Sequence, residues 1–250
     1  MNIVIVGSGN VAYHLIKSFK NNEISINQLF GRNDIELAKL SEKFTIPYST
    51  KEIQKADLYI IAVSDKAITE VSKTIPFDDV LVAHTSGSLP KEILEGNYRK
   101  ASFYPLQTFS KTKELDYSKI PFFIEAENDS DSELLSKLAH QISDKVMFSN
   151  FEKRKYIHLT AVFACNFVNH LFARAKEISD SQEIPFDYFV PLIDETVEKI
   201  HSLEPKDAQT GPAVRNDQSI LDAHEKLISD EEQLKIFKTL NESIKKMYDL

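Results

Sequence analysis

The amino-acid sequence predicts an α/β fold in which a parallel-sheet domain is followed by an all-α domain. Strand-like apolar runs and helical repeats alternate up to about residue 150, which is typical of a parallel sheet covered by helices on both faces. Beyond residues 146–148 only helical repeats follow. A chain of 250 residues suits two modest domains. We therefore expect domains at residues 1–150 and 151–250.

The first strand, residues 3–6, runs directly into a glycine motif that opens a helix. Gly7 permits a tight turn, and Gly9 lets a pyrophosphate approach the main chain. The N–H groups of the first helical turn then point at the phosphates. This order is typical of a Rossmann-type dinucleotide-binding domain, although a tight turn that binds nothing is the structural alternative. The expected cofactor-binding residues of the motif are Gly7, Ser8, Gly9, Asn10 and Val11.

The later elements of the first domain follow from the same patterns. Asn33 or Asp34 can cap the next helix, with Glu36 closing a capping box. The apolar run at 56–63 should be a central strand. Each strand ends in polar or small residues, at the edge where open α/β sheets bind ligands. Strands are predicted at residues 27–30, 46–49, 56–63, 80–83, 100–104 and 122–125, and helices at 35–44 and from about 67.

The second domain is predicted to contain helices only. The first helical stretch is apolar on most sides, which indicates burial against other helices or a partner subunit. We expect a homodimer formed through this domain. Ser229 and Glu232 make a capping box for the last helix. The predicted helices lie at about 151–178, 188–203, 218–228 and 231–248.

The composition argues against several classes of function. A net charge of −8 without a basic block argues against a nucleic-acid partner. Residues 159–175, the most apolar later stretch, are too few and too polar to span a membrane. Cys165 is the only cysteine and the chain begins directly with a core strand, so we expect a cytoplasmic protein. The seven scattered histidines predict no metal site.

The residues after the second strand indicate which dinucleotide binds. An NAD site normally carries an acidic residue there, which bonds the ribose 2′-hydroxyl. Here the position holds Gly31-Arg32-Asn33. The guanidinium of Arg32 suits a 2′-phosphate, so we predict NADP as the cofactor, with Arg32 and Asn33 among its binding residues. Asp34 would supply the missing acid if the strand ended later. An adenylate or a flavin is a third possibility.

Six further segments carry a resemblance to a known family. Together with the glycine turn, they resemble the uncharacterised Rossmann-like proteins that carry a C-terminal helical domain of unknown function and are provisionally described as NADP oxidoreductases. Their N-terminal domain is similar to that of pyrroline-5-carboxylate reductase and the β-hydroxyacid dehydrogenases. The segments are Gly31-Arg32-Asn33, Ala62-Val63-Ser64-Asp65, His84-Thr85-Ser86-Gly87-Ser88, Tyr104-Pro105-Leu106-Gln107-Thr108, His158-Leu159-Thr160-Ala161-Val162-Phe163-Ala164-Cys165-Asn166 and Thr210-Gly211-Pro212-Ala213-Val214-Arg215-Asn216-Asp217.

The resemblance also implies roles for individual residues. It places Val63, Ser64 and Asp65 near the nicotinamide ribose and Ser86 near the nicotinamide. In β-hydroxyacid dehydrogenases a lysine four residues before an asparagine performs acid–base catalysis. Matching that asparagine to Asn166 puts Val162 at the lysine position. Two functions therefore stay open. One is an NADP-dependent oxidoreductase that transfers hydride between nicotinamide and a small polar or carboxylated metabolite. The other is a non-catalytic NADP-binding sensor or scaffold.

Three polar side chains are the candidates for catalysis. His158 and Asn166 are spaced to share one face of the long helix, where a histidine could exchange a proton with a substrate and an asparagine could orient it. His84 follows a buried strand and precedes a small polar loop. Either histidine can instead be a hydrogen-bonded structural residue. The candidates for binding the small-molecule substrate are Ser88, Gln107, Asn169 and Arg215.

Overall fold

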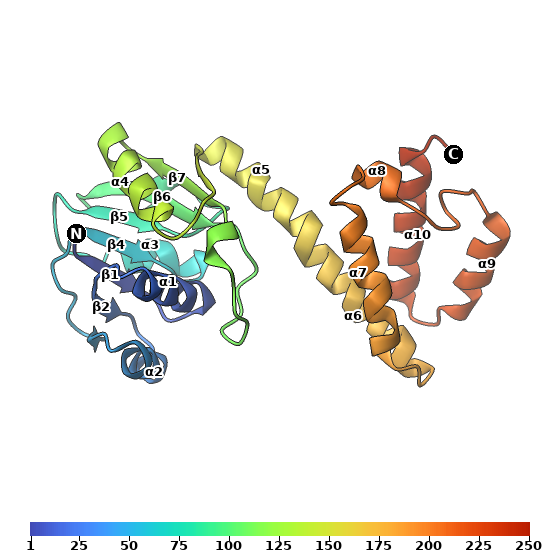
Figure 1. Ribbon diagram of the computed structural model, residues 1–250, viewed down its shortest axis with the longest axis horizontal. Coiled ribbons are helices and arrows are strands. Elements are labelled where there is room, and N and C mark those ends of the chain that lie inside the picture. Colours follow the sequence, from blue (N-terminus) through green and yellow to red (C-terminus); the bar gives the residue numbers. More distant parts are fainter. The chain divides into compact units, whose positions relative to one another are not determined.

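The computed structural model describes residues 1–250, which divide into two compact units, Met1–Asn166 and Phe167–Leu250. The first unit contains a sheet with helices packed on it, and the second contains helices only (Figure 1). The expected α/β fold with an all-α C-terminal region is confirmed. The division falls inside the long helical stretch rather than at residue 150, because the beginning of that stretch is bonded to the sheet.

The first unit is built on one eight-stranded sheet with the order β3-β2-β1-β4-β5-β6-β7-β8. Neighbouring strands from β3 to β6 in this order are parallel. The apolar run at 56–63 forms β4, which is an inner strand as expected. The strands are β1 (Ile3–Val6), β2 (Ile26–Phe30), β3 (Tyr48–Ser49), β4 (Leu58–Ile61), β5 (Leu81–His84), β6 (Arg99–Pro105), β7 (Phe122–Ala126) and β8 (Val146–Phe148).

The direction of β7 corrects one expectation. β7 pairs antiparallel with β6, and β8 runs parallel to β7. The carboxyl end of β7 therefore lies at the opposite edge from the carboxyl ends of β1 to β6. Glu125, near that end, pairs with Ser102 in the sheet. The polar end of this strand does not join the others at the ligand-binding edge, contrary to the sequence prediction.

Both faces of the sheet are buried. Alternate residues of β1 point to opposite sides, as the two-residue period of a strand requires. Ile3 and Ile5 lie in a core with residues of α1 (Asn10–Asn21), α2 (Asp34–Phe44) and α4 (Asp129–His140). Val4 and Val6 lie in a second core with residues of α3 (Ile68–Ser72) and its surroundings. Burial on both faces explains why these strands are continuous apolar runs.

A long helical segment begins after β8 and continues into the second unit. Its parts are α5 (Phe151–Ala161), a π-helical segment (Val162–Phe167) and α6 (Val168–Ser181). Its apolar side chains are not all buried by the chain itself, since Leu159 is 48% and Ile178 49% exposed. The sequence predicted burial of this stretch against other helices or against a partner subunit. The chain itself leaves these two residues exposed, and burial in a partner subunit stays a prediction.

The second unit continues with four shorter helices. Asp217 caps α9, as one interpretation of the sequence had it. The cap of α10 differs from the expected Ser229, because the helix begins at Glu231 and the Asp230 carboxylate accepts a hydrogen bond from the Gln233 N–H. None of the helices combines the length and apolar composition that crossing a bilayer requires. The helices are α7 (Val190–Lys199), α8 (Pro205–Ala208), α9 (Gln218–Leu227) and α10 (Glu231–Met247).

Candidate functional site

A cavity of about 600 Å³ opens at the carboxyl ends of β1, β2 and β4. Parallel sheets bind nucleotides at this edge, where the order of strands reverses on either side of β1. The cavity is also lined by Thr50 of the loop after β3, and by Glu70 and Val71 of α3. Nine residues nominated from the sequence for cofactor binding lie in its wall: Gly7, Ser8, Gly9, Asn10, Val11, Arg32, Asn33, Val63 and Ser64.

The two glycines of the turn are required for different physical reasons. Gly7 has a φ of +124°, and a Cβ there would overlap the Ala62 carbonyl oxygen, so only glycine fits. At Gly9 a Cβ would meet no protein atom within 4 Å. The space beside Gly9 is thus free for a ligand to approach the main chain. This open main chain is what a dinucleotide pyrophosphate requires of such a turn.

Helix α1 begins directly at the cavity wall. Its N-cap is Gly9, which has no side chain to cap the helix, and no acidic residue lies in the first turn. The free N–H groups and the positive end of the helix dipole therefore face the cavity without a negative partner from the chain. The Asn10 side chain donates to the Phe109 carbonyl at 2.9 Å, which ties the loop after β6 to this turn. The arrangement suits an anion such as phosphate.

The end of β2 places a cation beside the cavity. Arg32 is exposed and makes no hydrogen bond or ion pair within the chain, so its guanidinium is available to a ligand. Asn33 accepts a hydrogen bond from the Glu36 N–H at 3.2 Å and is the N-cap of α2. Asp34, the alternative acid, is directed to Tyr48, whose pKa is raised by burial first and then by this neighbouring carboxylate. Asp34 does not line the cavity.

A small polar loop follows β5 and contacts the segment after β4. The Ser88 hydroxyl donates to Asp65 at 2.5 Å, and the Ser88 N–H donates to the Ser86 hydroxyl at 3.1 Å. Asp65 follows Ser64, which lines the cavity. Asp65, Ser86 and Ser88 themselves do not line it. These three nominated residues therefore form one hydrogen-bonded group next to the cavity wall.

His84, at the end of β5, is hydrogen-bonded to this loop. Its side chain is fully buried, and its Nδ1 accepts a hydrogen bond from the Ser86 N–H at 3.1 Å. Nε2 is buried without a hydrogen-bond partner. Burial, and secondly the positive charge of Arg154, lower the pKa of His84 to about 4. His84 is therefore neutral at neutral pH, and this geometry suits a residue that holds the loop rather than one that exchanges protons.

Tyr104 is a residue that the sequence analysis did not nominate. It stands near the end of β6, is only 8% exposed, and its hydroxyl lies 3.1 Å from Nδ1 of His158 on α5. Burial, then the charge of Asp65, raise the pKa of Tyr104 to about 12. The ring lies directly on Gly87, where a Cβ would come within 2.5 Å of it. The signal in the sequence was a tyrosine before proline at the carboxyl end of a strand.

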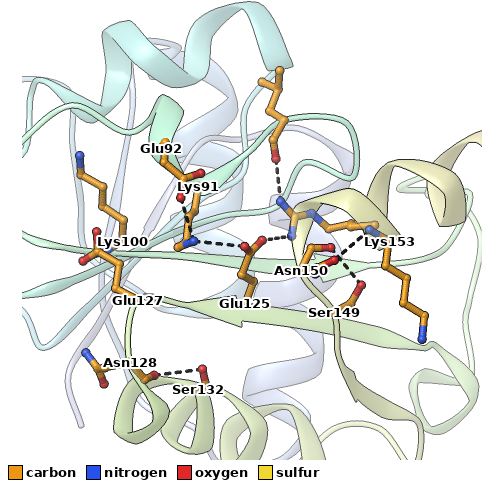
Figure 2. A network of polar contacts seen from close by, with 12 residues as sticks. Lys91, Glu92, Lys100, Glu125, Glu127, Asn128, Ser132, Ser149, Asn150 and Lys153 are labelled. Carbon is orange, nitrogen blue, oxygen red and sulfur yellow. Dashed lines mark hydrogen bonds and ion pairs between the residues drawn. The ribbon is translucent and has the colours of Figure 1, made fainter.

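A buried arginine anchors α5 to the sheet. Arg154 is fully buried and donates to Glu125 of β7 at 2.5 Å and to the Leu89 carbonyl at 2.7 Å. Figure 2 shows Glu125 at the centre of this network, with Lys91 donating to the same carboxylate at 3.1 Å. Arg154 precedes His158 by one helical turn, so both side chains lie on one face of α5. An arginine in a helical stretch usually lies at the surface, and its burial was not foreseen.

The remaining nominated residues are not part of the cavity wall and lie in the loop after β6, in the long helical segment and in the second unit. Gln107 lies in the loop after β6, where its side chain accepts a hydrogen bond from the Thr108 N–H at 2.8 Å. Asn166 is exposed, and Asn169 and Arg215 are exposed in the second unit. The single polar face expected for His158, Asn166 and Asn169 is interrupted, because the π-helical segment has a wider turn than an α-helix and rotates the residues that follow.

Comparisons with known proteins agree with this architecture. The model of a family described as a domain of unknown function (DUF2520) matches residues 120–244. A Bacteroides fragilis protein provisionally called an NADP oxidoreductase is 38% identical, with a TM-score of 0.92, and the match covers 100% of this chain and 98% of that one. A comparison with curated proteins gave no match.

More distant solved structures share the fold. A Thermotoga maritima protein is 24% identical over 96% of this chain and 99% of its own, with a TM-score of 0.79. A pyrroline-5-carboxylate reductase from Streptococcus pyogenes is 13% identical over 100% of this chain and 99% of its own, with a TM-score of 0.66. The family match and the 38% identical structure confirm the resemblance found in the sequence motifs. The chain belongs to the DUF2520 family of Rossmann-like proteins.

Proposed function

We propose that the protein is a cytoplasmic NADP-dependent oxidoreductase acting on a small polar or carboxylated metabolite. The observation that carries the proposal is the open cradle at Gly9, beside an uncapped helix end and an unpaired Arg32. The Bacteroides fragilis relative, which is provisionally called an NADP oxidoreductase, supports the same function. Bound NADPH would supply a hydride, and the chain supplies binding, orientation and proton transfer.

The residues of the cavity have distinct tasks in this proposal. The main chain of Gly7 to Val11 and the first turn of α1 hold the pyrophosphate. Val63 and Ser64 position the nicotinamide half, and the hydrogen-bonded group of Asp65, Ser86 and Ser88 borders it. His84 holds that loop in place. The roles expected for Gln107, Asn166, Asn169 and Arg215 toward a substrate stay predictions.

Arg32 decides between the two nicotinamide dinucleotides. Its guanidinium has no competing partner in the chain, and Asp34 is directed elsewhere, so the end of β2 offers a cation and no acid to the ribose. The acid in the cavity wall, Glu70 of α3, is paired with Lys73 at 2.8 Å. We expect Arg32→Ala to weaken NADPH binding by about 1.5–3 kcal/mol, the scale of a charged hydrogen bond, and to leave NADH nearly unchanged. Since the chain has no tryptophan, the fluorescence of bound NADPH measures both affinities with little background.

A matched control uses an exposed cation elsewhere in the same unit. Lys20 is exposed near the end of α1, away from the cavity wall, and Lys20→Ala should leave NADPH affinity unchanged. Equal losses of NADPH and NADH affinity in the Arg32 variant would contradict the role of Arg32 in cofactor selection. Failure of the wild-type protein to bind either dinucleotide would overturn the proposed function itself.

The alternative is a non-catalytic sensor or scaffold that binds NADP, and it is motivated by Val162 at the position of the dehydrogenase lysine. Incubation with NADPH and a panel of cyclic imines, α-keto acids and aldehydes, or with NADP⁺ and hydroxyacids, discriminates the two. A change of nicotinamide absorbance at 340 nm with any of these compounds supports the enzyme. Tight NADPH binding without turnover of any compound supports the sensor.

A further inference from the structure

The pair formed by Tyr104 and His158 lies close to the cofactor cavity through a continuous series of contacts. Ser64 lines the cavity, and the next residue, Asp65, accepts a hydrogen bond from Ser88. Gly87, between Ser86 and Ser88, lies against the ring of Tyr104. The phenol therefore borders the same polar loop that borders the nicotinamide end in the proposed function.

The close contact between Gly87 and the ring of Tyr104 requires glycine at position 87. Any side chain at position 87 would overlap the ring, with a Cβ 2.5 Å from Cζ and 2.8 Å from Cε1 of Tyr104. The ring also lies 6.2 Å, centroid to centroid, from that of Phe123 on the neighbouring strand. The phenol is thus held between the loop and the sheet, and few other orientations are open to it. A proton donor needs this kind of fixed position.

The hydrogen bond to His158 leaves the phenol able to act on a second partner. A phenol oxygen has one hydrogen to donate and can also accept hydrogen bonds. When Nδ1 of His158 carries a proton, it donates to the Tyr104 oxygen, and the O–H of Tyr104 is then free for another acceptor. His158 is only partly buried, so solvent can restore its proton.

We propose that Tyr104 is the proton donor to the substrate and that His158 is the relay residue that supplies its proton. The proposal rests on the oxidoreductase function proposed above and identifies the reacting group as a carbonyl or an imine. The substrate gains a hydride at carbon, which bound NADPH supplies as it is oxidised, and a proton at oxygen or nitrogen. The Tyr104 O–H bond breaks as this proton transfers.

The relay completes the balance of protons. As Tyr104 loses its proton to the substrate, protonated His158 transfers the proton on Nδ1 to the phenol oxygen. Tyr104 returns to its neutral form and His158 becomes neutral, then takes one proton from solvent. Transfer from His158 means that a free phenolate, which burial disfavours at this position, does not accumulate.

Arg154 acts as a positioning residue for this pair. It joins the Leu89 carbonyl at the end of the polar loop to Glu125 of the sheet, one helical turn before His158. The loop that contacts Tyr104 and the helix that carries His158 are therefore held by one guanidinium. This arrangement places the phenol and the imidazole from two separate elements at hydrogen-bond distance.

The proposal can be tested without knowing the substrate. Protein labelled with ¹³C at the tyrosine Cζ gives one resonance for each of the nine tyrosines, and the one missing in Tyr104→Phe belongs to Tyr104. In the protein without cofactor, His158→Gln should shift this resonance because it removes the imidazole. Tyr156→Phe, which replaces an exposed tyrosine of the same helix, is the matched control and should leave it in place.

Cofactor binding then tests whether Tyr104 lies near the bound nicotinamide ring. At saturation, which NADPH fluorescence and competition by NADP⁺ establish, we expect the two redox forms to shift the Tyr104 resonance differently, because only the oxidised nicotinamide ring is positively charged. An identical Tyr104 resonance in free and saturated protein would overturn the assignment of Tyr104 while leaving NADP binding intact. A protein that binds neither form would instead refute the proposed function on which this inference rests.

Kinetics test the proton transfer itself. For any imine or carbonyl compound of the panel that the wild-type protein reduces, Tyr104→Phe should lower kcat by about 10²–10⁴-fold, the range of general acid catalysis. NADPH affinity should stay within about two-fold, since Tyr104 does not line the cofactor cavity. His158→Gln should lower kcat by a smaller factor. An unchanged kcat in Tyr104→Phe would overturn the proposal.

Discussion

The two units of the chain differ in how completely they bury their apolar side chains. The first unit buries most of its large hydrophobic residues in two cores, one on each face of the sheet, although Phe148, Tyr156 and Leu159 are exposed. In the second unit the buried hydrophobic residues are only Ala213 and Leu221, whereas Tyr188, Leu192 and Leu227 are 72%, 65% and 81% exposed. The sheet unit therefore has extensive cores of its own, while the helical unit has a large apolar surface that the chain does not cover.

The largest effect is expected where α5 is attached to the sheet unit. Arg154→Ala removes one partner of a buried ion pair, so the negative charge of Glu125 is less well compensated. We therefore expect the free energy of unfolding to fall by about 3–5 kcal/mol. Urea denaturation followed by circular dichroism measures the loss. Lys155→Ala breaks the exposed pair with Glu152 and should cost about 0–1 kcal/mol. Similar losses in both variants would show that the attachment does not depend on Arg154.

Variants of the two glycines in the turn should affect different properties, one the stability and the other the binding of NADPH. Gly7→Ala forces a side chain into a positive-φ position against the Ala62 carbonyl, and should lower the free energy of unfolding by about 3 kcal/mol. Gly9→Ala meets no protein atom and should change stability by less than about 0.5 kcal/mol, yet weaken NADPH binding at least about ten-fold. Thermal unfolding and NADPH titration of both variants make the test. A Gly9 variant that binds normally would contradict the pyrophosphate cradle.

The low pKa of His84 predicts how the stability of the sheet unit depends on pH. The pKa of this buried histidine is about 4 in the folded chain and about 6.5 when unfolded, so between these pH values the unfolded state binds the extra proton. Stability is therefore fully present above about pH 6.5 and falls as the pH decreases toward 4, by about 3 kcal/mol in total from this group. Urea denaturation across this range should show a flatter profile for His84→Asn.

The control for this prediction is an exposed histidine of the same unit. His140→Asn, at the end of α4, should keep the pH dependence of the wild-type protein. The asparagine at position 84 retains an acceptor for the Ser86 N–H, so loss of that hydrogen bond does not dominate the comparison. A steep acid dependence that survives in His84→Asn would assign the effect to another group.

The last prediction concerns the helical unit and tests association rather than stability. If its uncovered apolar residues form the expected homodimer, Leu192→Glu should increase the fraction of monomer while changing the affinity for NADPH by less than about two-fold. Sedimentation equilibrium at several concentrations measures the association. Lys235→Glu, which changes an exposed charge on α10, controls for charge alone. A wild-type protein that stays monomeric at all concentrations would contradict the dimer.

Much of the sheet unit could be predicted because its signals are local. A strand that ends in Gly7 and Gly9 and continues as a helix specifies a turn, and the turn specifies a main-chain site for phosphate. Asn33 caps α2 by a hydrogen bond three residues along the chain, which a capping pattern reveals. Nine of the nominated cofactor residues consequently line one cavity in the structure.

Other features could not be predicted because they join residues far apart in the sequence. The hydrogen bond between Tyr104 and His158 connects residues 54 positions apart, and that between Glu125 and Arg154 connects residues 29 apart. The π-helical segment depends on hydrogen bonds of its own backbone that the side-chain spacing does not reveal, so the continuous polar face through Asn166 was not formed. The antiparallel direction of β7 was missed for the same reason, since an apolar run indicates a strand but not its direction.

The amino-acid sequence alone determined the succession of elements, the glycine turn, the arginine beside it and the family resemblance, because each follows from residues close together in the chain. Only the tertiary structure decided that His84 is buried and neutral, that Arg154 is a buried anchor and that Tyr104 is paired with His158. The physical reason is that burial, pKa and hydrogen-bond partners depend on which distant segments surround a side chain. Local spacing specifies a helix or a turn, but packing specifies its chemistry.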